Sequence, residues 1–326
     1  MRNLLSFFKK TPAKPENLVA LDFGTISTKA FVFSLDEEVE LRGQGRGTPE
    51  EAVEQAATQA GVRPTQAVVG IGGENIWCLT TTVRFNRSQP EAAIQAEEIT
   101  KLQQQIFRTA LIQATTQMSQ FVNDPELTLQ PVDSENLSYK IDGQLVGDPL
   151  GQVGKILEAS VFTAHSPAAH LQRLTKFLKK FDLNLWAVCS LMSILIKALA
   201  NEERSNFNAI ILDIGGRVTD VAVVFGGGIW GTRPLALGGE NFALPFWLSG
   251  IETALADFEG VKSFPNRIIL TGGGAQIEGL KEGLLDYPLT RALPFISQPI
   301  VEVRTDVGPQ NMKLVAEEIA GGNNAD

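Results

Sequence analysis

Two short stretches of the chain share one pattern of apolar and polar positions. Residues 18–33 and residues 210–224 each begin with an apolar run, pass through an Asp-x-Gly turn and continue as a second apolar run. Apolar runs of this length, bounded by turn residues, predict buried strands, so each stretch is expected to form a β-hairpin. The two stretches align at a constant offset of 191 residues. The residues that the alignment pairs are Asp22 with Asp213, Gly24 with Gly215, and Thr28 with Thr219.

The rest of the chain alternates helical and strand patterns. A helix is expected over 48–61, with Thr48 as its N-cap and Pro49 as its first residue. Further helices are expected over 90–118, 167–181 and 276–285, and strands over 67–71, 79–85, 137–141 and 156–162. Residues 186–201 predict a strand that leads into a helix, and residues 241–258 about one helix and a turn. No apolar run approaches the length of a membrane span.

The turns of the two hairpins have the residues that a phosphate site needs. Gly24, Gly215 and Gly216 allow positive φ angles and let a backbone N–H group approach a phosphate closely. Asp22 and Asp213 end the strands before them, where a carboxylate suits a hydrated divalent cation or an attacking water. One such turn alone is weak evidence, but two copies in one chain favour a nucleotide clamp.

A third glycine cluster, Gly272 to Gly274, follows the apolar run 267–271. Three glycines ahead of a predicted helix let the backbone pass close to a ribose or a phosphate, although any strand-to-helix connection can contain them.

Composition narrows the class of protein. The 326 residues carry a net charge of −9 and are 44% hydrophobic, which is typical of a globular chain and argues against nucleic-acid binding through bulk charge. Cys78 and Cys189 lack the spacing of a zinc site and indicate reduced thiols. His165 and His170 lack a third ligand and predict no metal centre.

The first ten residues form a distinct basic and apolar segment. Leu4, Leu5 and Phe8 share one face at helical spacing, with Phe7 beside them, and Lys9 and Lys10 follow. Ten helical residues are too short to span a bilayer. They suit the surface of an anionic membrane, and the alternative is a helix that docks on the protein itself.

The hairpins and the late Thr-Gly-Gly-Gly resemble the actin, Hsp70 and sugar-kinase superfamily. Within it, the middle of the chain resembles the bacterial cell-division protein FtsA. The matching segments are Tyr139-Lys-Ile-Asp-Gly143, Asp148-Pro-Leu-Gly151, Gly154-Lys-Ile-Leu-Glu158 and Leu237-Gly-Gly-Glu-Asn241. The pilus-assembly protein PilM is similar to FtsA overall but matches the middle segment less well, so a PilM-like protein is the second candidate.

The resemblance implies an α/β fold of the duplicated, actin-like (ribonuclease H-like) type, with two lobes and an FtsA-type subdomain 1C. It implies subdomain 1A over 17–78 and 164–203, 1C over 79–163, and 2A over 204–240 and 266–310. Residues 241–265 are then a remnant of the lid subdomain 2B, which is reduced or missing. Residues 1–16 are a tail and linker, and residues 311–326 a polar tail without the amphipathic helix that ends FtsA proteins.

The same resemblance assigns a site for ATP and Mg²⁺. Asp22 and Asp213 would hold Mg²⁺ through water or orient the attacking water. The cofactor-binding residues would be Gly24, Thr25 and Lys29 in the first hairpin; Gly215, Gly216 and Thr219 in the second; Gly238, Gly239 and Glu240 at the ribose; and Gly272, Gly273 and Gly274 by the adenosine.

Two departures from the family weaken this site. Arg217 stands where relatives have a small residue, and it can either pair with a phosphate or block one. Only 32 residues separate Gly239 from Gly272, which leaves room for little of the lid. A base left in contact with water predicts weak nucleotide binding and at most slow hydrolysis.

The function implied is a scaffold that binds an FtsZ-like or other division partner, self-associates through 1C and lies on the inner face of the cell membrane, with residues 1–10 as the anchor. The alternatives are a PilM-like cytoplasmic adaptor of a pilus complex and, less favoured, a small-molecule kinase. Binding of nucleic acid is not expected.

Overall fold

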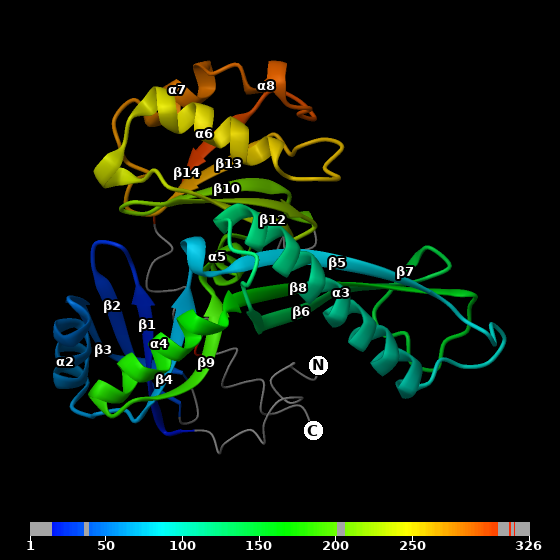
Figure 1. The fold of residues 1–326 in the computed structure, drawn as a ribbon, viewed down its shortest axis with the longest axis horizontal. Helices are drawn as coiled ribbons and strands as arrows, with labels where there is room; N and C mark the ends of the chain where they lie inside the picture. Colours follow the sequence, from blue (N-terminus) through cyan, green and yellow to red (C-terminus); the bar gives the residue numbers. More distant parts are fainter. Residues whose placement is uncertain (1–14, 36–38, 201–205, 306–312, 314–315, 317–326) are drawn as a thin grey trace.

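The computed structural model describes residues 15–35, 39–200, 206–305, 313 and 316. These residues form two α/β lobes and a third unit, which extends to one side of them in Figure 1. Residues 1–10, expected to be a membrane anchor, lie outside the described residues.

The first lobe is a five-stranded sheet with helices packed on it. Its strand order is β3-β2-β1-β4-β9. The strands are β1 (Asn17–Phe23), β2 (Thr28–Ser34), β3 (Glu40–Gly47), β4 (Gln66–Ile71) and β9 (Asn184–Ser190). The helices are α2 (Pro49–Ala60), α4 (Ala168–Leu178), which the short 3₁₀ helix η2 (Lys179–Phe181) follows, and α5 (Leu191–Ala200).

Helix α2 lies directly on the backbone of β3. A Cβ atom at Gly43 would stand 2.2 Å from the carbonyl oxygen of Ala56, and one at Gly45 would stand 2.1 Å from that of Ala52. Glycines on the strand and alanines on the helix therefore allow this close packing. The capping box of Thr48 with Glu51 confirms the predicted start of the helix.

The second lobe repeats the topology of the first. Its strands are β10 (Ala209–Ile214), β11 (Thr219–Phe225), β12 (Gly228–Leu235), β13 (Arg267–Thr271) and β14 (Ile300–Val303). In both lobes the opening strand pairs antiparallel with the next strand and parallel with a later one, β4 in the first lobe and β13 in the second. The helices are α6 (Leu244–Ala256), α7 (Leu280–Asp286) and α8 (Leu289–Ala292).

Helix α6 belongs to the core of the second lobe. Trp247, Ile251 and Leu255 on this helix are fully buried against Leu212 and Val223 of the sheet. The segment 241–265, expected to be a remnant of a lid, thus contributes the main helix on this face of the second sheet. The subdomain boundaries themselves stay predictions.

The third unit, residues 77–167, is an antiparallel sheet with one long helix across it. It contains β5 (Trp77–Asn86), α3 (Ala96–Val122), β6 (Leu129–Ile141), β7 (Gln144–Val146) and β8 (Ile156–Pro167), in the sheet order β5-β8-β6-β7. Strand β5 also meets β12 at the pair Gly231 and Leu79, so the third unit and the second lobe share one nine-stranded sheet. Figure 1 shows this sheet running from the second lobe into the projecting unit.

Most predicted elements are confirmed, with shifted ends. The two hairpins, the strand 67–71 and the helix 167–181 form where expected. The helix expected from residue 90 begins at Ala96, where the Glu98 side chain accepts a hydrogen bond from the backbone N–H of Gln95. The helix expected from residue 276 begins only at Leu280, so the prediction that it directly follows the three glycines was wrong. No helix among the described residues is long and apolar enough to cross a membrane.

Candidate functional site

The first hairpin places an ion pair at the boundary between the two lobes, where the sequence predicts the nucleotide site; this boundary is called the cleft below. Asp22 at the end of β1 pairs in register with Lys29 on β2, and Lys29 Nζ lies 3.0 Å from Asp22 Oδ2. The Asp22 side chain is only 17% exposed. The lysine therefore compensates the charge of the carboxylate that the sequence assigned to a cation.

The second hairpin places two carboxylates at the equivalent positions. Asp213 at the end of β10 lies directly opposite Asp220 on β11. Burial and the nearby Asp22 raise the pKa of Asp213 to about 6, although Lys29 opposes the shift. Burial and the nearby Asp213 raise the pKa of Asp220 to about 7. Asp213 and Asp220 therefore lose their protons at higher pH than ordinary carboxyl groups do.

Asp220 is a cleft residue that sequence reasoning missed. Its Oδ2 accepts a hydrogen bond of 2.9 Å from the backbone N–H of Gly73, in the 3₁₀ helix η1 (Gly73–Asn75) that follows β4. The carboxylate therefore links the second lobe to the end of a first-lobe strand. The signal was present in the repeat, because Asp220 stands 191 residues after Lys29.

The turns of the two hairpins contact each other directly. The backbone N–H of Arg217 donates a hydrogen bond of 3.1 Å to Thr25 Oγ1. A Cβ atom at Gly216 would lie 2.3 Å from Cγ1 of Ile26, so this isoleucine lies against the glycine backbone. Thr25 and Ile26 of the first hairpin turn thus lie directly against residues 216 and 217 of the second.

The strand-end turn at residues 238–240 lies on the second hairpin. Gly239 N–H donates to the carbonyl of Gly215, and Glu240 N–H donates to that of Gly216. In the 3₁₀ helix η4 (Gly239–Asn241), Glu240 also binds Arg217, whose Nε lies 2.9 Å from Glu240 Oε2. The Arg217 side chain is therefore directed toward Glu240, on the side expected for the ribose.

The third glycine cluster completes the same neighbourhood. Gly272 has a φ of 82°, and a Cβ atom there would meet Asp213 Oδ1 at 2.4 Å. Gly274 N–H donates to the carbonyl of Ile214 at 2.8 Å, and its Cα lies 3.8 Å from the Cβ position of Gly239. Gly273 has open space around it. The turn of the second hairpin, the turn at residues 238–240 and the third glycine cluster therefore all lie at the end of β10.

Thr219 has a structural role in this arrangement. It is fully buried, its hydroxyl donates to the carbonyl of Leu237 at 2.7 Å, and it accepts a hydrogen bond of 3.0 Å from the indole Nε1 of Trp247. The first bond connects β11 to the segment after β12, and the second connects it to α6. The expectation that Thr219 contacts a nucleotide stays a prediction.

The histidines and cysteines do not have the features of reactive groups. Burial lowers the pKa of His165 on β8 to about 4, and His170 lies on α4. Cys78 and Cys189 are buried thiols, and burial raises the pKa of Cys78 to about 12, which makes it a poor nucleophile. No group of three or more His, Cys, Asp and Glu side chains suited to a metal ion occurs among the residues that the structure describes.

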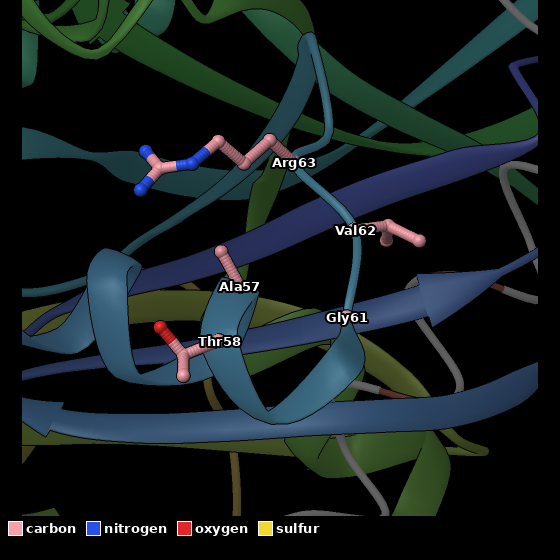
Figure 2. A pocket seen from close by; sticks show the side chains of 5 residues that line it. All are labelled: Ala57, Thr58, Gly61, Val62 and Arg63. Atoms are coloured by element: carbon pink, nitrogen blue, oxygen red, sulfur yellow. The ribbon is translucent and has the colours of Figure 1, made fainter.

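A hollow at the end of α2 is unrelated to the cleft. Figure 2 shows its lining, which comprises Ala57, Thr58, Gly61, Val62 and Arg63. Arg63 extends away from the chain in this view and forms a two-point bond with the Glu54 carboxylate, at 2.6 and 2.8 Å. The hollow is open and contains no buried charge aimed into it, so it lacks the features of a ligand site.

Comparison with known proteins places this geometry in a known fold. A chain of the PilM–PilN type IV pilus biogenesis complex superposes with a TM-score of 0.55 at 15% sequence identity, over 94% of this chain and 96% of that one. The fold is actin-like. This assignment agrees with the repeated strand order of the two lobes and with their matching hairpins.

In sequence, the actin-like chain is similar to FtsA. It is 24% identical over 267 residues to the cell division protein FtsA of Bacillus subtilis, which covers 76% of this chain and 57% of that protein. It is 25% identical over 247 residues to FtsA of Pseudomonas aeruginosa, which covers 69% and 55%. The chain thus spans little more than half the length of these relatives. No protein-family model matches it.

Proposed function

We propose that this protein is an actin-like scaffold of the FtsA kind, with weak or vestigial ATP binding. It would link an FtsZ-like or other division partner to the inner face of the cell membrane and associate with itself through subdomain 1C. The similarity to FtsA supports the role in division. The contact of Thr25 with Arg217 supports weak rather than tight nucleotide binding, because a ligand between the two turns would compete with this hydrogen bond.

A nucleotide titration tests the binding part of the proposal. Calorimetry with ATP and Mg²⁺ is expected to give a dissociation constant of about 1 mM, equivalent to roughly −4 kcal/mol. Gly273→Val is the matched variant, because Gly273 has open space and its substitution leaves the packing intact while filling the adenosine position. Loss of the heat in this variant supports the site. Micromolar affinity, rapid hydrolysis, or no heat at all with the wild-type protein contradicts weak binding.

A partner assay tests the division role. The purified protein is immobilised and exposed to the FtsZ-like protein of its own organism, with and without ATP and Mg²⁺. Specific, saturable binding is expected in both conditions because the proposed scaffold role does not depend on tight nucleotide binding. Absence of binding, together with capture of a pilus inner-membrane peptide, would instead favour the PilM-like adaptor. One observation favours this second candidate: the pilus-complex structure is covered over 96% of its length.

A vesicle assay tests the membrane anchor. We propose that the tail binds anionic membranes through Leu4, Leu5, Phe7 and Phe8, with Lys9 and Lys10 facing the headgroups. Leu5→Asp is expected to weaken sedimentation with anionic vesicles strongly, since it places a charge on the apolar face. Ser6→Asp is the charge-matched control and should weaken it less. Equal losses in the two variants would leave net charge as the cause and refute the apolar anchor.

A further inference from the structure

The third unit is bonded to the second lobe through a buried arginine. Arg233 on β12 is only 9% exposed, and its guanidinium carbon lies 4.7 Å from the Trp77 ring centre and 4.8 Å from the Phe258 ring centre. Trp77 begins β5 of the third unit, and Phe258 follows α6 of the second lobe. A cation held between two aromatic faces away from water is a strong and directional contact. This contact flanks the point where Gly231 and Leu79 join the two sheets.

The guanidinium also has its donors directed at backbone oxygens. Nη1 donates to the carbonyl of Thr232 at 2.8 Å, and Nη2 donates to that of Asp257 at 3.1 Å. Asp257 ends α6, so the arginine binds the strand, the helix end and the third unit together. Its removal would break contacts on three elements at once.

The same unit is bonded to the first lobe through different residues. Asp133 Oδ2 on β6 accepts a hydrogen bond of 3.2 Å from the backbone N–H of Ser190, where β9 passes into α5. Lys197 Nζ on α5 lies 3.4 Å from Glu135 Oε2 on β6, with both side chains mostly buried. Partly buried ion pairs are screened less by salt than exposed ones. The third unit therefore has independent contacts with both lobes.

The segment that leads into the third unit also connects the two lobes. Gly73, four residues before Trp77, donates its N–H to Asp220 in the cleft. Any opening that moves β11 away from β4 must break this bond and also displace the start of β5. A hinge motion between two lobes requires a few connecting residues whose backbone angles change. Here the connecting residues 73–77 are bonded to the second lobe through Gly73, so they resist such a change.

We propose that the third unit is a brace that fixes the angle between the two lobes and so keeps the contacts between their hairpin turns in place. The closed contact of the hairpin turns is then a consequence of the brace as well as of the turns themselves. Breaking the Arg233 joint releases the second lobe from the brace, so the lobes sample a wider range of separations.

Distance measurement between spin labels tests the brace on the full chain. Labels are placed at Glu50→Cys on α2 and Lys281→Cys on α7, which are exposed positions on opposite lobes, while the native cysteines are buried. The parent protein is expected to show one narrow distance distribution that ATP and Mg²⁺ do not shift. Arg233→Leu is expected to broaden this distribution and move it to longer distances.

Two further variants separate the brace from simple loss of stability. Arg84→Leu removes an arginine from the same strand system, but its partner Glu158 lies within the third unit, so it should leave the distribution unchanged. Arg233→Lys keeps the charge and loses the flat stacking group, and it should give an intermediate broadening. A folded Arg233 variant with an unchanged distribution overturns the brace, as does equal broadening in the Arg84 variant.

Amide hydrogen exchange of the unaltered protein gives an independent readout if the Arg233 variants fail to fold. The brace requires that residues 73–80 and 228–235 exchange as slowly as the centres of β1 and β10. Exchange about tenfold or more faster in these joint segments, roughly 1.4 kcal/mol of lower local stability, would show that the joint opens on its own and overturn the proposal.

Discussion

Replacement of Asp220 by asparagine is expected to stabilise the protein at neutral and alkaline pH. The native structure raises the pKa of this carboxyl from about 3.8 to about 7. That difference corresponds to an upper value of about 4 kcal/mol, at roughly 1.4 kcal/mol per tenfold change in proton affinity. Asparagine retains an oxygen that can accept from Gly73 N–H and removes the negative charge beside Asp213.

The sign of the pH dependence follows from proton binding. Between pH 4 and pH 7 the native carboxyl retains its proton while the unfolded one has lost it, so raising the pH draws the equilibrium toward the unfolded state. The cost is absent below about pH 4 and complete above about pH 7. Asp213, with a pKa of about 6, adds a smaller loss over the lower part of this range.

The measurement is urea denaturation followed by tryptophan fluorescence from pH 4 to pH 8, in the presence of a chelator. The free energy of unfolding of the Asp220→Asn variant should exceed that of the parent by up to about 4 kcal/mol at pH 8 and match it near pH 4. Asp286→Asn, an exposed site on α7, is the control for the loss of one carboxylate and should change the free energy of unfolding by less than about 0.5 kcal/mol. A variant that is less stable at pH 8, or one with a constant difference at all pH values, refutes the reasoning.

Three further substitutions test the packing around the site by denaturation. Trp247→Phe should cost about 1–3 kcal/mol, since it leaves a void and removes the bond to Thr219; no loss would contradict the burial. Arg87→Met should cost about 3–5 kcal/mol, because it leaves the Glu98 carboxylate without its two-point partner; a neutral result would show that the pair is dispensable. Gly272→Ala should destabilise, through its positive φ and the clash with Asp213, whereas Gly273→Ala should be tolerated; equal effects would contradict the turn geometry.

The duplicated hairpins were predictable because local patterns define them. An apolar run, a glycine turn and a second apolar run predict a hairpin without reference to the rest of the chain. The start of α2 could be predicted in the same way, because its N-cap Thr48, its first residue Pro49 and the capping-box residue Glu51 lie within four positions of the sequence. The alignment of Asp22 with Asp213 then correctly brought both residues to the ends of equivalent strands.

The contacts between the lobes were not predictable in the same way. The bond between Asp220 and Gly73 joins residues 147 positions apart, and the bond between Arg217 and Thr25 joins residues 192 positions apart. Hydrophobic periodicity describes local structure and does not predict contacts between residues so far apart in the sequence. Whether Arg217 pairs with a phosphate therefore could not be decided from the sequence. In the structure its side chain binds Glu240 instead.

The third glycine cluster shows a different limit. Gly272 to Gly274 were correctly expected to form a turn near the cleft, but the pattern after them resembled a helix from residue 276. The chain instead continues through turns, with Gly279 at a φ of 76°, before α7 begins. Two glycines inside the apparent helix pattern, Gly279 and Gly283, were the local warning.

The two hairpins that began as copies of one pattern have diverged in charge. Lys29 neutralises Asp22 on one wall of the cleft, while the equivalent position on the other wall is Asp220, beside a second carboxylate. With all four groups ionised, the cleft floor carries two net negative charges, and a polyphosphate would meet repulsion on one side only. The two walls therefore share one backbone pattern but differ in charge, neutral in the first hairpin and negative in the second. An anion between them would meet less repulsion near Lys29 and would need a cation to approach Asp213 and Asp220.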